Sequence, residues 1–138
     1  MIAVFDIDGV LADATHRQHY LQSRPKDWQG FFRAVGDDGP IARGIDLVRE
    51  AGREGPVVLL SGRPESTRAA TEEWLARHGV AHDRLVLRPE GDYRAAAVAK
   101  AELLSAVAAP GEVSAVWDDD ASVVAALGAL GYPARLFR

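Results

Sequence analysis

The sequence predicts an α/β protein built on a doubly wound, mainly parallel five-stranded sheet of the Rossmann-like type. Short apolar runs alternate along the chain with longer segments of helical character. In α/β proteins this alternation produces right-handed crossovers, which place the strands parallel to one another. The runs also lack the strict apolar–polar alternation of a strand with one wet face, which indicates burial on both faces.

In the N-terminal half, apolar runs bounded by turn residues predict the strands, and segments bounded by helix-breaking residues predict the helices. We expect a strand at residues 2–7, which ends at the turn at Gly9, and a second strand at 57–60, which is an apolar tetrad after Pro56. Between them we expect helices at 12–22 and 27–35, separated by Ser-Arg-Pro at 23–25, and a third helix at 41–53, which Pro40 opens and Gly52 closes.

The C-terminal half continues the same alternation. We expect helices at 65–78, which Gly79 stops, at 94–108, which follows the turn at Gly91, and at 121–130. The strands expected between and after them are at 84–88, which ends near Pro89, at 113–117, which ends at a run of aspartates, and at 134–137. Glycine permits sharp turns and proline interrupts helices, which is why these residues mark the boundaries.

Length and composition narrow the organisation of the protein. A chain of 138 residues, 48% of them hydrophobic, suffices for one core, so we expect one domain over residues 1–138, with a candidate small helical lid at 13–39. The sequence has no run of about 18 apolar residues and no basic leader of a signal peptide, so we expect a cytoplasmic protein without a membrane partner. The oligomeric state stays open.

Two features of the composition restrict the chemistry. Cysteine is absent, which excludes disulfides, thiolate catalysis and cysteine-ligated zinc, so that oxygen or imidazole must hold any metal. The net charge of −4 argues against tight nucleic-acid binding, sequence-independent or sequence-specific, because such binding depends on many Lys and Arg side chains.

Polar residues follow three of the predicted strands and should meet at one edge of the sheet. They are Asp6 and Asp8 after the first strand, Ser61, Gly62 and Arg63 after the second, and Asp118 and Asp119 after the fourth. The carboxyl ends of parallel strands form the ligand-binding edge of open α/β sheets. Phosphoryl transfer needs a nucleophile, a proton donor and positive groups around the phosphate oxygens, and this set, joined by Lys100, offers a candidate for each.

Four motifs in this order resemble those of the haloacid dehalogenase (HAD) superfamily of aspartate-nucleophile phosphohydrolases. They are D-I-D-G-V at 6–10, L-L-S-G-R at 59–63, Lys100 and W-D-D-D at 117–120, and they cover nearly the whole chain. The resemblance implies a HAD-like fold with little or no cap, a nucleophilic Asp6 that becomes an aspartyl phosphate, and acid–base work by Asp8. It also implies that the Ser61-Gly62-Arg63 turn and Lys100 bind the phosphoryl oxygens.

The same resemblance implies a magnesium cofactor. Mg²⁺ would be held by the carboxylate of Asp6, the backbone carbonyl of Asp8 and the acidic pair Asp118 and Asp119, with waters completing its octahedron. Three adjacent carboxylates at 118–120 repel one another, and a bound cation relieves that repulsion.

A narrower set of segments is similar to the phosphatase domain of phage polynucleotide kinase/phosphatase enzymes. These segments are L-A-D-A-T-H-R at 11–17, K-D-W at 26–28, S-G-R at 61–63, T-E-E-W-L at 71–75 and R-P-E-G-D-Y-R at 88–94. The similarity implies removal of 3′-phosphates from nucleic-acid ends. The chain departs from the pattern at Ala96, where an acidic residue is expected, and at Asp120, where a basic one is expected; both departures bear on the substrate rather than on the class of chemistry.

We therefore expect a phosphorylated substrate, in particular a DNA or RNA end. With only residues 13–39 available as a lid the crevice should be open, which suits a polymer end, whereas small metabolites usually require a lid that excludes water. The candidates for substrate contact are Arg88 and Arg94, with His16, Arg17 and Asp92 at the rim.

Three alternatives stay open. The first is a HAD phosphatase for a small nucleotide or sugar phosphate. The second is a phosphate-accepting signalling module such as a response-regulator receiver, although a receiver has its acidic pair after the first strand and its lysine after the last. The third is a non-catalytic binding module of the same fold. A separate kinase or ligase partner also stays open, and we expect Trp28, Trp74 and Trp117 to pack in the core or lid rather than to stack on bases.

Overall fold

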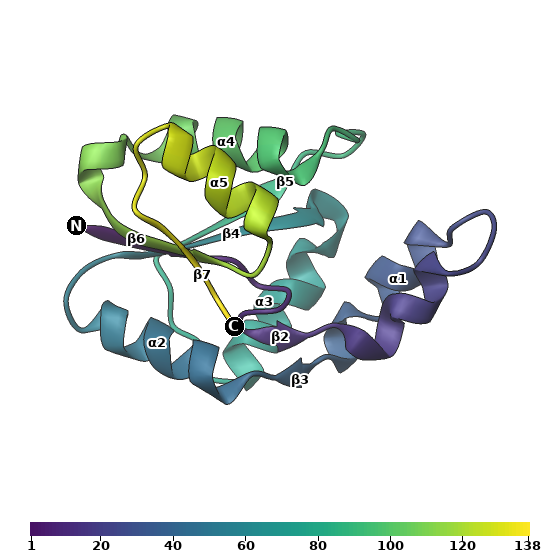
Figure 1. Ribbon diagram of the computed structural model, residues 1–138. Helices are drawn as coiled ribbons and strands as arrows, with labels where there is room; N and C mark the ends of the chain where they lie inside the picture. The colour runs from purple at the N-terminus through teal and green to yellow at the C-terminus, as the bar shows by residue number, and fades with distance from the viewer.

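The computed structural model describes residues 1–138 and contains a five-stranded sheet in the order β5-β4-β1-β6-β7. The strands are β1 (Ile2–Phe5), β4 (Val57–Pro64), β5 (Arg84–Arg88), β6 (Val113–Asp118) and β7 (Ala134–Leu136). Every neighbouring pair is parallel, and the sheet forms the central layer in Figure 1. The predicted α/β fold with a mainly parallel five-stranded sheet is confirmed.

Two helices cover each face of this sheet (Figure 1). They are α2 (Ala42–Gly52) and α3 (Arg68–Arg77) on one face, and α4 (Ala96–Val107) and α5 (Ala121–Ala129) on the other. Successive side chains of β1 alternate between the faces, so Phe5 belongs to the apolar cluster that contains Trp74, and Val4 to the cluster that contains Leu104. The central strand is therefore apolar at every position. None of the helices combines the length and the apolar character needed to cross a membrane.

The strands and helices of the sheet layers lie close to their predicted positions, with one large difference at β4. This strand runs on to Pro64, whereas the sequence predicted its end at residue 60. Beyond Leu60 the pairing with β5 shifts in register and resumes between Pro64 and Arg88. The polar residues at 61–63 suggested a turn, but the chain stays extended there as part of β4 and buries the side chains of Ser61 and Arg63.

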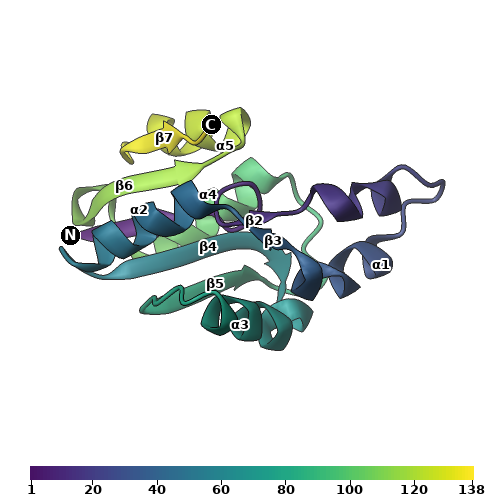
Figure 2. The same ribbon diagram turned by 90° about the horizontal axis from the view of Figure 1, so that it is seen from below.

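The segment between β1 and α2 differs most from the prediction. A short antiparallel pair, β2 (Ala12–Asp13) and β3 (Gly39–Pro40), forms its base, so the helix predicted at 12–22 is wrong at its start and is found only from residue 15 on, as a 3₁₀ helix. Between the two strands, the chain forms the 3₁₀ helix η1 (Thr15–Leu21), the helix α1 (Trp28–Arg33) and the 3₁₀ turn η2 (Val35–Asp37). The backbone and side chain of Thr15 both donate to the Asp13 carboxylate, which favours a turn over a continuous helix. Figures 1 and 2 show this segment projecting away from the sheet.

Candidate active site

Three carboxylates meet where β1 and β6 end. Asp6, Asp118 and Asp119 each bring an oxygen within 4.8 Å of the others. The pairing of the two strands positions them, because the Asp6 amide donates to the Trp117 carbonyl at 2.9 Å. The chain then turns at Gly9, whose φ of 82° is in the left-handed region. A Cβ at Gly9 would lie 1.9 Å from Asp119 Oδ2, so the acidic cluster also requires the small residue.

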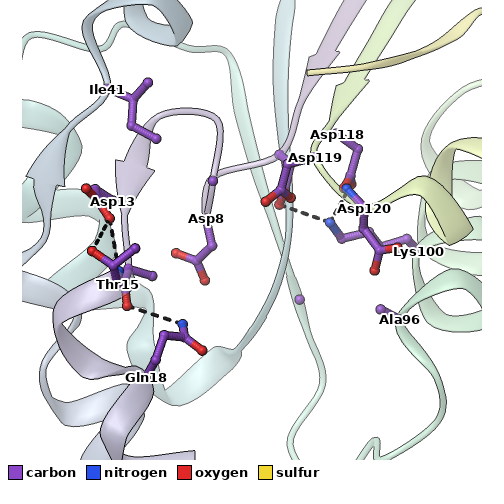
Figure 3. Close-up of a pocket in the computed structure, with 14 residues that line it drawn as sticks. Asp8, Asp13, Thr15, Gln18, Ile41, Ala96, Lys100, Asp118, Asp119 and Asp120 are labelled. Atoms are coloured by element: carbon purple, nitrogen blue, oxygen red, sulfur yellow. Dashed lines mark hydrogen bonds and ion pairs between the residues drawn. The ribbon is translucent and has the colours of Figure 1, made fainter. Parts of the chain in front are cut away.

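Lys100 of α4 reaches into this cluster and is buried there. Its Nζ lies 2.9 Å from Asp6 Oδ1 and 2.7 Å from Asp118 Oδ2, and Figure 3 shows it beside the acidic residues. Burial lowers the pKa of the Lys100 ammonium, but Asp6 and Asp118 outweigh burial and raise it. Lys100 is therefore a permanent cation between two strand-end carboxylates.

The surroundings of Asp6 disfavour the ionised form of its carboxyl group. Burial raises the pKa of its carboxyl well above the usual value; Lys100 opposes this rise, whereas Asp118 and Asp8 add to it. The pKa of Asp119 is also raised, first by burial. When all three are ionised, one ammonium faces three carboxylates, and this excess of negative charge adds to burial in raising the pKa values of Asp6 and Asp119.

The donor set fits a magnesium ion. Mg²⁺ binds oxygen ligands and is usually held by one or two carboxylates together with water. Asp6, Asp118 and Asp119 offer convergent carboxylate oxygens with an excess of negative charge. The neighbouring pocket, about 540 Å³ in volume, has the room for water and a phosphate ester, and it is lined by acidic and small residues, among them Gly62 and Ala96 (Figure 3).

Asp8 lines the same pocket but belongs to a different set of contacts. Its Oδ1 accepts from Arg63 Nη2 at 2.8 Å and from Arg17 Nη2 at 2.9 Å. Burial raises the pKa of the Asp8 carboxyl, but Arg63 and Arg17 together outweigh burial and lower it. In Figure 3 its carboxylate points away from Asp119. Two carboxylates only two residues apart thus have opposite electrostatic environments.

The two arginines are held by a second carboxylate, that of Asp38, which the sequence analysis did not identify. Arg17 donates to both oxygens of Asp38, at 2.8 and 2.7 Å, and Arg63 donates to Oδ2 at 3.0 Å. All three side chains are buried. Trp74 Nε1 donates to the Asp38 carbonyl at 2.7 Å, which fixes the backbone there. Asp38 lies in a Gly-Asp-Asp-Gly turn whose local sequence indicates only a loop.

The remaining predicted site residues divide between two places. Ser61 is buried, and its Oγ accepts from the Arg63 amide at 3.1 Å, while Gly62 faces the pocket. Arg63 contacts Asp8, Asp38 and Thr71 rather than lining the pocket. Arg88 and Arg94 are not with the acidic cluster; they line a second groove beside it. Asp120 lines the first pocket and caps α5 through Ser122.

Comparisons with known proteins agree with this geometry. The family described as the polynucleotide kinase PNKP phosphatase domain matches residues 1–134. No curated protein matches the chain. Among solved structures, a chain of the Pnkp1/Rnl/Hen1 complex is 28% identical with a TM-score of 0.81, over 99% of this chain and 45% of that one. A chain of the Pnkp1/Rnl/Hen1 RNA repair complex is 27% identical with a TM-score of 0.83, over 99% and 42%.

These two similar chains are longer proteins, because the present chain spans less than half of each. L-2-haloacid dehalogenase from Xanthobacter autotrophicus shares the fold at 13% identity, with a TM-score of 0.69 over 96% of this chain and 75% of that one. The family match covers nearly the entire sequence, and the HAD-like fold agrees with it. The chain therefore belongs to the family of polynucleotide kinase PNKP phosphatase domains, which are HAD-type phosphatases.

Proposed function

We propose that this protein is a magnesium-dependent phosphatase that removes 3′-phosphates from nucleic-acid ends through an aspartyl phosphate on Asp6. The single observation that carries the proposal is that Asp6 and Asp8 line one pocket but have different charged partners. Asp6 lies in the acidic cluster with Lys100, whereas Asp8 lies on the same pocket under two arginines. The similarity to chains of an RNA repair complex supports a nucleic-acid substrate.

In the first step, a carboxylate oxygen of Asp6 attacks phosphorus while the bond from phosphorus to the ester oxygen breaks. Because Arg63 and Arg17 lower the pKa of Asp8 in the free protein, Asp8 first takes up a proton from solvent when the negatively charged ester binds, and it then gives this proton to the leaving oxygen. Lys100, 2.9 Å from Asp6, stabilises the negative charge of the equatorial phosphoryl oxygens. The products of this step are the free hydroxyl and phosphorylated Asp6.

In the second step, Asp8 accepts a proton from the water that attacks the phosphorylated Asp6. The bond between phosphorus and the Asp6 oxygen breaks, inorganic phosphate leaves, and both aspartates return to their starting states. Mg²⁺, when bound by Asp6, Asp118, Asp119 and the Asp8 carbonyl, would supply charge neutralisation. Arg17 and Arg63 hold the Asp8 carboxylate in place through both steps.

The first test is inorganic phosphate release from a 3′-phosphorylated oligonucleotide, with Mg²⁺ and with EDTA, beside equimolar nucleoside and sugar monophosphates. We expect magnesium-dependent turnover that is strongest on the oligonucleotide. Asp6→Asn should abolish turnover at unchanged fold, and Asp46→Asn, an exposed carboxylate of α2, is the matched control.

Two results would contradict the proposal. Stoichiometric phosphorylation of Asp6 without turnover would indicate a phosphate-accepting signalling module instead. A strong preference for a small ester would leave the aspartate mechanism standing and overturn the substrate.

A further inference from the structure

A second groove adjoins the acidic pocket and belongs to no step of the proposed chemistry. Its volume is about 1210 Å³, beyond the roughly 300–1,000 Å³ of a typical small-molecule site. It shares Gly62 and Ala96 with the acidic pocket, so the two form one continuous surface. One wall is α1 and the other is the loop between β5 and α4. Figure 1 shows both projecting on the same side, beyond the end of β4.

The groove carries exposed aromatic side chains. Trp28 of α1 is 50% exposed, and its ring stacks on that of Phe32 at 5.9 Å and an interplanar angle of 23°. Tyr93, on the loop opposite, is 92% exposed. Trp28 packs within the lid segment, as predicted, but its exposed half also lines the groove. The stack is anchored to the active site, since Phe31 packs edge-on against Trp28 and under the Arg17 guanidinium, 4.4 Å away.

The groove also carries cations that the protein does not fully neutralise. Arg33 is exposed and has no salt-bridge partner, and Arg88 has a buried Nε without a hydrogen-bond partner. Arg94 is neutralised by Asp92, at 2.9 Å, and by Glu102.

The acidic side chains of the groove are already engaged. Asp92 pairs with Arg94, and Glu90 Oε1 accepts a bond from the Ser66 amide. Three arginines and two carboxylates line the groove, so its charge is positive by one, in a protein whose net charge is −4. Arginine and exposed aromatic rings together are the elements that bind single-stranded nucleic acid.

We propose that this groove binds the unpaired nucleotides that precede the terminal 3′-phosphate. Their bases stack on Trp28 and Tyr93, and their phosphates contact Arg33 and Arg88. The proposal rests on the proposed function, because the terminal phosphate occupies the adjoining acidic pocket. It predicts that the enzyme selects single-stranded ends, since the bases of a blunt duplex cannot reach the aromatic walls.

The test is a series of 3′-phosphorylated substrates of increasing length, from a mononucleotide to a hexanucleotide, prepared in both RNA and DNA, with a blunt duplex for comparison. We expect kcat/KM to rise with length over the first few nucleotides and then level off, and to be lower on the blunt duplex. Stacking contributes about 1–3 kcal/mol per base, so Trp28→Ala should lower kcat/KM on the hexanucleotide by roughly 10-fold relative to the mononucleotide, mainly through KM. Leu130→Ala, at an equally exposed apolar residue after α5, is the matched control.

A second pair of variants tests the contribution of the charge of the groove. Arg33→Gln should lower the affinity for the hexanucleotide and reduce its salt dependence, whereas Arg53→Gln, at the exposed end of α2, should do neither. Binding is measured without turnover in the Asp6→Asn protein, as quenching of tryptophan fluorescence that Trp28→Phe removes.

The outcomes separate the two proposals. Equal kcat/KM at all lengths, together with unaltered hexanucleotide binding in Trp28→Ala and Arg33→Gln, would overturn the groove proposal while turnover of 3′-phosphates stands. Absence of turnover on every 3′-phosphate would overturn the proposed function itself. Different slopes for the RNA and DNA series would identify which polymer the groove prefers.

Discussion

Asp38 is the residue on which the two arginines of the site converge, and we expect it to be important for stability. Its side chain is fully buried, as are those of Arg17 and Arg63. Asp38→Asn would leave two buried guanidinium groups with only Asp8 as a charged partner, and the loss of one partner from a buried ion pair costs about 3–5 kcal/mol. We expect a fall of that size in the free energy of unfolding, measured with urea.

Asp46→Asn is the matched control for this change. Asp46 is exposed and lies 3.7 Å from Arg49, so its loss should stay within about 0.5 kcal/mol. Equal stability of the two variants would mean that the buried cluster contributes nothing to folding. Because Asp38 touches Asp8 only through the arginines, kcat should also fall in Asp38→Asn.

The arginines also determine how Asp8 titrates. Burial raises the pKa of the Asp8 carboxyl, and Arg63 and Arg17 lower it further than burial raises it. A carboxyl whose pKa is depressed on folding stabilises the protein above the unfolded pKa of about 3.9, and this contribution is lost as the pH falls through the folded pKa. Stability should therefore decline more steeply on acidification in the wild type than in Asp8→Asn.

The direct measurement is the carboxyl-carbon shift of Asp8 by NMR against pH. We expect a midpoint below the usual aspartate range in the wild type and a higher midpoint in Arg63→Met. A midpoint that does not move in the variant would show that Arg63 has no electrostatic influence on Asp8.

At the scale of elements, α2 packs unusually closely against the turn after β1. A Cβ at Gly44 would lie 1.7 Å from the Val10 carbonyl oxygen, a contact that backbone atoms cannot relieve without moving the helix. Glycine to alanine in a helix ordinarily gains about 1 kcal/mol. Gly44→Ala should instead lower the free energy of unfolding by more than about 1 kcal/mol, and it should lower activity because the turn carries Asp8.

Gly128 of α5 gives the opposite expectation. A Cβ there meets nothing within 4 Å, so Gly128→Ala should raise stability by up to about 1 kcal/mol. Urea unfolding of both variants measures the contrast. Stabilisation by Gly44→Ala would mean that α2 can withdraw from the turn at little cost.

The elements that the sequence predicts well are those with local causes. β5 lies at its predicted bounds because an apolar run is closed by Pro89. The extension of β4 could not be predicted in the same way, because Ser61 and Arg63 are polar and are buried only through partners far along the chain. The antiparallel pair β2–β3 could not be predicted either, because two-residue strands leave no periodic pattern in the sequence.

At the scale of the whole molecule, topology explains which site residues could be located in advance. Strand-end residues of β1 and β6 must converge, because neighbouring parallel strands end at one edge, and Asp6, Asp118 and Asp119 do so. Arg88 ends β5, which is separated from β1 by β4, so it lies in the second groove instead. The burial of Arg17 depends on Asp38, twenty-one residues away, and no local pattern indicates that contact.

The acidic edge of the sheet leads to a prediction for the whole fold: Mg²⁺ should stabilise it. A ligand that binds only the folded state adds about 2.7 kcal/mol at a concentration one hundred times its Kd, which for a chain of this length raises Tm by several degrees. Asp119→Asn should remove this shift, because it removes one of three convergent carboxylates. Asp120→Asn should keep it, since Asp120 lies outside that cluster and asparagine also caps helices.

The measurement is Tm by differential scanning calorimetry in Mg²⁺ and in EDTA at constant ionic strength, which needs no substrate. An equal shift in Asp119→Asn and in the wild type would place the ion elsewhere on the surface. An equal shift with Na⁺ in place of Mg²⁺ would mean that general screening, rather than a bound divalent ion, relieves the repulsion among the carboxylates. If Tm rises only with Mg²⁺ and only in proteins that retain Asp119, the excess negative charge at the ends of β1 and β6 is the feature that couples metal binding to folding.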